Sequence, residues 1–260
     1  MNSQAIRDAA ELLWITRLRQ ERIDALPPDL RPATLAEGYA IQDAMVACAR
    51  QPVAGWKIAA TSKAGQAHIG VTEPLAGRLF ADFVLKSGAS LPAKPLHMKV
   101  VEAEFAFRMG RDLPPRPEPY GTAEVCQAAE ALHLAIEVPD ARYEDFAHVG
   151  APQIVADDGF ASWFLLGPRL SHWSDLDLPK QPVRVLRNGM VVAEGSGANA
   201  LGDPRLALGW LAENLSKRGI GLKAGDLVTT GTCITPATIG PGDKIVAEFP
   251  GLGQVTAEFS

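Results

Sequence analysis

Several features that would assign a function directly are missing from this sequence of 260 residues. Its three cysteines, Cys48, Cys126 and Cys233, are widely spaced and form no Cys-x-x-Cys pair, which is typical of core residues in a reducing compartment. No run of Lys and Arg occurs and the formal net charge is −5, which argues against nucleic acid and against an anionic membrane surface. No apolar stretch is long enough to span a bilayer, and the N-terminus lacks the pattern of a secretory signal. We therefore expect a cytoplasmic protein with a small-molecule partner.

Common catalytic signatures are absent as well. The sequence contains no glycine-rich phosphate loop, no Gly-x-Ser-x-Gly elbow and no repeat period. The five histidines are scattered, and each fits an ordinary, partly buried histidine. Hydrophobic residues make up 47% and charged residues 21%, which predicts a globular protein with a substantial core.

Periodicity and capping signals predict four helices and several strands. The helices are expected from Ser3 to about Ile23, from the Thr34–Glu37 capping box to about Arg50, from Thr122 to about Leu132, and from Asp203-Pro204 to Gly219. Asn188-Gly189 predicts a hairpin, a second hairpin is expected over 244–259, and 69–78 is expected to be a loop. Strands outnumber helices and hairpins favour antiparallel or mixed pairing, so we expect an α+β fold. We divide it into an N-terminal helical part with the Lys57 strand, 1–78, and a β-rich catalytic core, 79–260.

The strand predicted from Val100 to Arg108 carries two acids on one face. Side chains alternate along a strand, so Glu102 and Glu104 lie opposite the row of Val101, Ala103, Phe105 and Phe107. Two carboxylates this close repel one another, and burial would strengthen the repulsion unless a cation lies between them. The pattern also fits the solvated face of an amphipathic strand, and both interpretations stay open.

Two further charged residues interrupt apolar strands. Glu137 lies between Ile136 and Val138 and faces the side opposite theirs. Three carboxylates without a nearby His or Cys would suit Mg²⁺ or Mn²⁺. Lys57 lies inside the strand after Gly55, where a lysine snorkels to solvent, pairs with an acid or loses its proton more readily.

A set of motifs in a fixed order resembles the fumarylacetoacetate hydrolase superfamily, in particular its hydratase/decarboxylase branch. The resemblance covers nearly the whole chain. The motifs are Gly55-Trp56-Lys57-Ile58 with Thr61-Ser62-Lys63, Glu102-Ala103-Glu104, Ala135 to Arg142, Val155-Ala156-Asp157-Asp158 with Leu166-Gly167, Gly195-Ser196-Gly197-Ala198, Leu201-Gly202-Asp203-Pro204, and Ala224-Gly225-Asp226 through Gly231.

The resemblance implies a fold, a reaction type and a set of site residues. The fold is a mixed β-sandwich roll with an N-terminal helical part, assembled into a homo-oligomer. Glu102, Glu104 and Glu137 would hold Mg²⁺ or Mn²⁺ beside an unsaturated 2-oxo acid of the kind met in the degradation of aromatic compounds. The ion would act as a Lewis acid that stabilises an enolate. Lys57 would transfer the proton or orient the group that does, and burial and the acids shift its pKa in opposite directions.

Other residues leave alternatives open. Arg142 and Thr232 are candidates to contact the substrate's carboxylate, and structural roles fit both equally. Relatives in the hydratase group usually have Glu-Pro-Asp where this chain has Glu73-Pro74-Leu75, and Leu75 cannot transfer a proton. We expect a hydratase resembling 2-keto-4-pentenoate hydratase. The alternatives are a decarboxylase of the 4-oxalocrotonate type, an acylpyruvate hydrolase, which needs a His/Glu pair, and a non-catalytic partner subunit.

Overall fold

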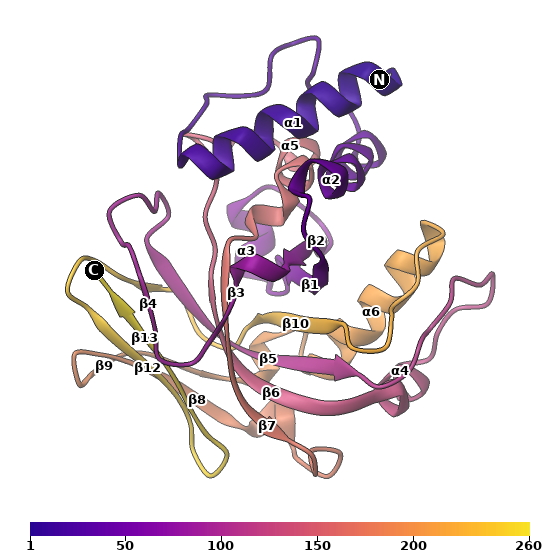
Figure 1. Ribbon diagram of the computed structural model, residues 1–260. Coiled ribbons are helices and arrows are strands. Elements are labelled where there is room, and N and C mark those ends of the chain that lie inside the picture. Colours follow the sequence, from indigo (N-terminus) through magenta and orange to yellow (C-terminus); the bar gives the residue numbers. More distant parts are fainter.

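Two β-sheets pack together in the computed structural model, which describes residues 1–260 (Figure 1). The helices over 3–19, 35–49 and 151–156 gather at one end of the sheets, and those over 122–128 and 204–217 lie apart from them, beside the larger sheet. The larger sheet has the order β2-β1-β10-β5-β6-β7-β3, with β11 paired to β5, and the smaller has the order β4-β13-β12-β8-β9. The strands are β1 Val53–Ala59, β2 Leu75–Phe80, β3 Val84–Lys86, β4 Ala89–Leu91, β5 Val100–Met109, β6 Ala129–Val138, β7 Trp163–Leu170, β8 Pro182–Arg187, β9 Met190–Ser196, β10 Leu227–Thr232, β11 Ala237–Thr238, β12 Lys244–Phe249 and β13 Gly253–Phe259. The predicted α+β class with mixed sheets is confirmed, because β1 pairs parallel to β10 and antiparallel to β2.

Four of the six helices begin where the sequence predicts, and the short helices over 63–68 and 151–156 were not predicted. The six are α1 Ser3–Arg19, α2 Leu35–Ala49, α3 Lys63–His68, α4 Thr122–Ala128, α5 Ala151–Ala156 and α6 Pro204–Lys217. The Thr34 hydroxyl accepts a hydrogen bond from the backbone N–H of Glu37, and the Asp203 carboxylate accepts one from Arg205. None of the helices has both the length and the hydrophobicity that crossing a membrane requires.

Two predictions about local structure were wrong. The helix expected from Thr122 to Leu132 ends at Ala128, and the chain continues directly into β6. Pairing with β5 and β7 on both sides outweighs the helix propensity of this Ala- and Leu-rich segment. The loop expected over 69–78 contains the start of β2, all of whose residues are buried.

The hydrophobic core has two main parts. The larger cluster contains the Val101, Ala103, Phe105 and Phe107 face of β5, and Phe105 packs there against Phe249 of the smaller sheet, with ring centroids 5.1 Å apart. The second cluster lies among α1, α2 and α5 and includes Leu75. Since β5 buries its apolar face in the first cluster, Glu102 and Glu104 point to the other side of the sheet. The division of the chain between residues 78 and 79 stays a prediction.

Candidate metal centre and adjoining cavity

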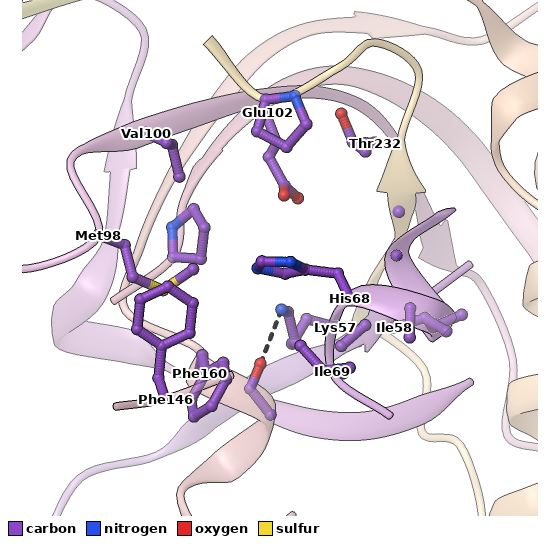
Figure 2. Close-up of a pocket in the computed structure, with 17 residues that line it drawn as sticks. Lys57, Ile58, His68, Ile69, Met98, Val100, Glu102, Phe146, Phe160 and Thr232 are labelled. Atoms are coloured by element: carbon purple, nitrogen blue, oxygen red, sulfur yellow. Dashed lines mark hydrogen bonds between the residues drawn. The ribbon is translucent and has the colours of Figure 1, made fainter. Parts of the chain in front are cut away.

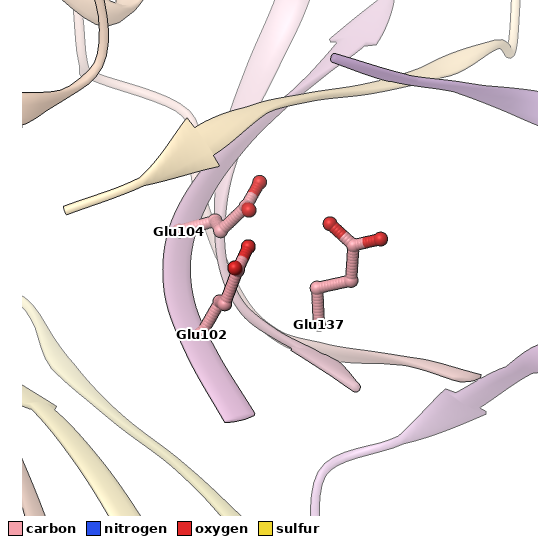
Figure 3. Close-up of side chains that lie close together, drawn as sticks. All are labelled: Glu102, Glu104 and Glu137. Carbon is pink, nitrogen blue, oxygen red and sulfur yellow. The ribbon is translucent and has the colours of Figure 1, made fainter. Parts of the chain in front are cut away.

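The register between β5 and β6 brings the three glutamates together. Glu102 lies directly opposite Glu137 in this antiparallel pair, and Glu104 lies two residues further along β5 on the same face. One carboxylate oxygen from each residue lies within 4.8 Å of the others (Figure 3). The predicted cluster is therefore present, and it is not the solvated face of a strand, because Glu104 and Glu137 are buried.

Strand β10, the neighbour of β5, holds Glu104 in place. The Thr229 hydroxyl and the Gly231 backbone N–H both donate to Glu104 Oε2, the latter over 2.9 Å. Gly231 has a φ of +92°, and a β-carbon there would lie 1.9 Å from the Thr61 hydroxyl oxygen, so only glycine fits. Glu104 thus has one oxygen held by β10 and the other, Oε1, left free.

Lys57 approaches the cluster from β1, two strands away from β5. Its Nζ lies 3.0 Å from Glu137 Oε1 and donates to the Gly159 carbonyl oxygen over 2.9 Å. Only 3% of Lys57 is exposed. Of the three possibilities that the sequence left open, the structure therefore selects pairing with an acid.

Burial and mutual repulsion perturb the protonation of the cluster. Burial raises the pKa of Glu102 to about 7, and repulsion by Glu137 adds to the effect while Lys57 opposes it. The pKa of Glu104 lies well above its usual value for the same two reasons. Burial by itself lowers the pKa of Lys57, but attraction by the three carboxylates outweighs it, so the net shift is upward. The cluster therefore favours the binding of positive charge, whether as protons or as a cation.

The unsatisfied atoms of the cluster fit a divalent cation. Glu104 Oε1 and Glu137 Oε2 are buried without a hydrogen-bond partner. Three carboxylates face one ammonium group, so two negative charges remain uncompensated when all are ionised. An all-oxygen, carboxylate-rich donor set suits Mg²⁺ or Mn²⁺, and the group contains no His or Cys that would favour zinc.

A cavity of about 240 Å³ opens beside the cluster. Lys57, Glu102 and Thr232 line it, and Figure 2 shows the Glu102 carboxylate and the Lys57 ammonium group both pointing into it. His68, the last residue of α3, also lines the cavity and projects between them in this view. The cavity therefore combines one carboxylate of the cluster with two side chains that can carry a proton.

The structure places the other two candidate residues differently. Thr232 is in the cavity wall, and its hydroxyl donates to the Ile234 carbonyl oxygen over 3.0 Å. Arg142 does not line the cavity: its guanidinium binds the Asp157 carboxylate, the Asp157 carbonyl oxygen over 2.8 Å and the Ala161 carbonyl oxygen over 3.2 Å. Leu75 is 1% exposed in the second hydrophobic cluster and also lies outside the cavity wall.

Several residues of the site could not be identified from the sequence. An isolated histidine such as His68 has no local signature, and only the short helix α3 brings it to the cavity. Thr229 has no local signature either, because its bond to Glu104 depends on the pairing of β10 with β5. Gly159, which accepts from Lys57, lies 102 residues away from it in the chain.

Comparison with known proteins relates this geometry to a family. The family model described as fumarylacetoacetate (FAA) hydrolase C-terminal matches residues 47–260. The 2-keto-4-pentenoate hydratase 1 of Dechloromonas aromatica (strain RCB) is 35% identical over 97% of this chain and 96% of its own. The 4-oxalocrotonate decarboxylase of Pseudomonas putida is 30% identical over 100% of this chain and 98% of its own.

A solved structure matches over the whole chain. It is the 4-oxalocrotonate decarboxylase from Pseudomonas putida G7 complexed with magnesium and adipate, which has a TM-score of 0.92 and 28% identity and covers 100% of this chain and 99% of its own. The predicted fold, a mixed roll of sheets with N-terminal helices, is confirmed by this match.

Proposed function

The chain belongs to the hydratase/decarboxylase branch of the fumarylacetoacetate hydrolase family, and from that premise we propose that it is a divalent-metal-dependent hydratase of an unsaturated 2-oxo acid. The observation that carries the proposal is the cluster of Glu102, Glu104 and Glu137 beside a cavity that Lys57 also lines. The full-length match to 2-keto-4-pentenoate hydratase 1 at 35% identity supports hydration as the reaction. Cytoplasmic location and a homo-oligomeric state stay predictions.

In this proposal the three glutamates hold Mg²⁺ or Mn²⁺. The unpartnered oxygens Glu104 Oε1 and Glu137 Oε2, together with a Glu102 oxygen, would be available as ligands. The bound ion supplies a Lewis acid for the carboxylate and keto oxygens of a 2-oxo acid. Thr229 and Gly231 fix the orientation of Glu104, so this ligand would not have to reorganise when the ion binds.

Lys57 and His68 are the proposed proton-transferring residues. Hydration of a dienol takes two steps: a proton adds to the far carbon as the enol proton leaves, and then water adds across the new double bond, giving a hydroxyl to one carbon and a proton to the other. Lys57 Nζ, fixed by Glu137 and the Gly159 carbonyl, holds a proton at the cavity wall. His68 projects between Lys57 and Glu102 in Figure 2 and supplies a second site for the proton or the water. Thr232 is a wall residue within reach of the substrate, and to Arg142 we assign a structural role.

Two observations support alternative reactions. The full-length structural match to a 4-oxalocrotonate decarboxylase supports decarboxylation. The presence of His68 in the cavity supplies the histidine that acylpyruvate hydrolysis requires. The intact cluster and Lys57 favour a catalytic chain over a non-catalytic partner subunit.

The test is turnover by the purified protein alone, with Mg²⁺ and with EDTA. We expect consumption of 2-keto-4-pentenoate, supplied as its dienol, with Mg²⁺ only, and a hydrated product by NMR. Carbon dioxide release from 4-oxalocrotonate alone would reassign the protein as a decarboxylase, and cleavage of an acylpyruvate alone would reassign it as a hydrolase. Turnover that EDTA leaves unchanged would contradict the metal-dependent proposal.

A further inference from the structure

The walls of the cavity differ sharply in chemistry from one side to the other. Lys57 and Glu102 bring charge to the side where the carboxylate cluster lies. Met98, Phe146 and Phe160 gather on another side (Figure 2). Phe146 and Phe160 pack edge to face with ring centroids 5.8 Å apart, so they form a continuous apolar surface.

The apolar side has no cation that could bind a second carboxylate. Among the residues that line the cavity, Lys57 and His68 are the only ones with a basic side chain. Lys57 is occupied by Glu137 and by the Gly159 carbonyl. His68 is exposed and contacts Phe146 edge to face, at 6.2 Å between ring centroids. No arginine lines the cavity at all.

We propose that the substrate is a monocarboxylic 2-oxo acid whose tail is uncharged and apolar and packs against Met98, Phe146 and Phe160. The inference rests on the proposed function, which places the 2-oxo acid group at the glutamate cluster. A tail carboxylate would lose its hydration against this wall without gaining a partner. An alkyl or alkenyl tail would instead be removed from water by the same side chains.

A matched pair of unreactive ligands tests the proposal. 2-Oxohexanoate and 2-oxoadipate have the same chain length and the same 2-oxo acid group, and only the second carries a carboxylate at the far end. Binding is measured calorimetrically to the Mg²⁺-loaded protein, with EDTA-treated protein as the blank. We expect Mg²⁺-dependent binding of both, with a Kd for 2-oxoadipate at least about tenfold higher.

Two variants of Phe146 sharpen the test. Phe146 is only partly buried, so a longer side chain can be accommodated there. Phe146→Arg places a guanidinium at the apolar side, and we expect the preference to shift toward 2-oxoadipate by about tenfold or more. Phe146→Leu is the control, and it should keep the preference for 2-oxohexanoate.

The outcomes separate this inference from the function on which it rests. If 2-oxoadipate binds the wild-type protein as tightly as 2-oxohexanoate, the inference is overturned, and loss of that binding in His68→Gln would assign the second carboxylate to His68. If neither ligand binds in a Mg²⁺-dependent way, the proposed function fails and the inference fails with it. The expected difference between the two ligands, shifted toward 2-oxoadipate in Phe146→Arg only, supports the inference.

Discussion

Two clusters of charged side chains in the molecule differ in charge balance and in how completely their carboxylates are hydrogen-bonded. In the first, Asp157 and Asp158 face Arg142 and Arg17, so the charges balance, and every carboxylate oxygen accepts a hydrogen bond. In the second, three glutamates face Lys57 alone, and Glu104 Oε1 and Glu137 Oε2 have no partner. Apart from Glu102, which lines the cavity, the charged residues of both clusters are buried.

The difference distinguishes a structural cluster from a binding site. A cluster with balanced charges, in which all the carboxylate oxygens accept hydrogen bonds, adds rigidity to the junction of β6 and α5. A cluster with excess charge and free oxygens is costly by itself and becomes favourable when a cation is added. Stability measurements should therefore respond to the first cluster, and measurements of metal binding and activity to the second.

The largest expected effect is on stability. Asp157→Asn removes the carboxylate that balances the buried Arg142 guanidinium. The free energy of unfolding, measured by urea denaturation, should therefore fall by about 3–5 kcal/mol. Exposed Asp145→Asn serves as the control. The folded fraction of Asp157→Asn should still bind Mg²⁺ as the wild type does. A loss of stability below about 1 kcal/mol would mean that the cluster is not structural.

The next effect is on activity. Lys57→Met removes the proposed proton donor, and kcat should fall by about 10²–10⁴-fold. Affinity for Mg²⁺ should be kept or increased, because a competing positive charge is removed. Lys63→Met, an exposed lysine of α3, is the matched control and should be active. Parallel loss of Mg²⁺ binding in Lys57→Met would contradict a role confined to proton transfer.

Protonation should set the metal affinity below neutral pH. The pKa of Glu102 in the metal-free folded protein is about 7, above its value of 4.5 in the absence of perturbation. Protons therefore compete with the ion, and the Mg²⁺ affinity should fall by up to about tenfold per pH unit below pH 7. A titration series from pH 5 to 8 measures this slope, and a flat series would contradict the assignment of Glu102 as a ligand.

The raised pKa of Glu102 should also make the stability of the metal-free protein depend on pH. Between about pH 4.5 and 7 the folded state binds more protons at Glu102 than the unfolded state does, so stability should fall as pH rises through this window. Glu102→Gln should remove this contribution. Thermal unfolding in EDTA is the measurement.

The smallest expected effect is on Mg²⁺ affinity, when the hydrogen bond that orients Glu104 is removed. Thr229→Val removes the hydroxyl that donates to Glu104, and Mg²⁺ affinity should fall by about threefold to tenfold. Thr230→Val is the control, because that hydroxyl is equally buried but donates to the Phe105 carbonyl oxygen. Equal losses of affinity in both variants would show that the effect is a general loss of packing.

Much of the fold and part of the site could be predicted from local patterns in the sequence. The period of two along β5 predicted that Glu102 and Glu104 share a face, and capping residues predicted the starts of α2 and α6. Glu137 was predicted from its isolation in an apolar strand, although its position opposite Glu102 follows only from the strand register.

The remainder depends on long-range contacts that have no local signature. The 129–132 segment has a helical composition but forms a strand because two neighbours pair with it. The opposing pKa effects on Lys57 could not be ranked until its distance to Glu137 was known. His68 and Phe146 meet in the cavity from segments almost eighty residues apart, and no periodicity in either segment predicts that contact.

Calorimetric titration of the metal-free protein with Mg²⁺ is the decisive test of whether the three glutamates form a metal site. We expect one ion per chain, binding weakened at least about a hundredfold in Glu102→Gln, and unchanged binding in Glu130→Gln, an exposed acid of β6. If the wild-type protein binds no ion stoichiometrically, or if Glu102→Gln binds as tightly as the wild type, the glutamate cluster is not the metal site.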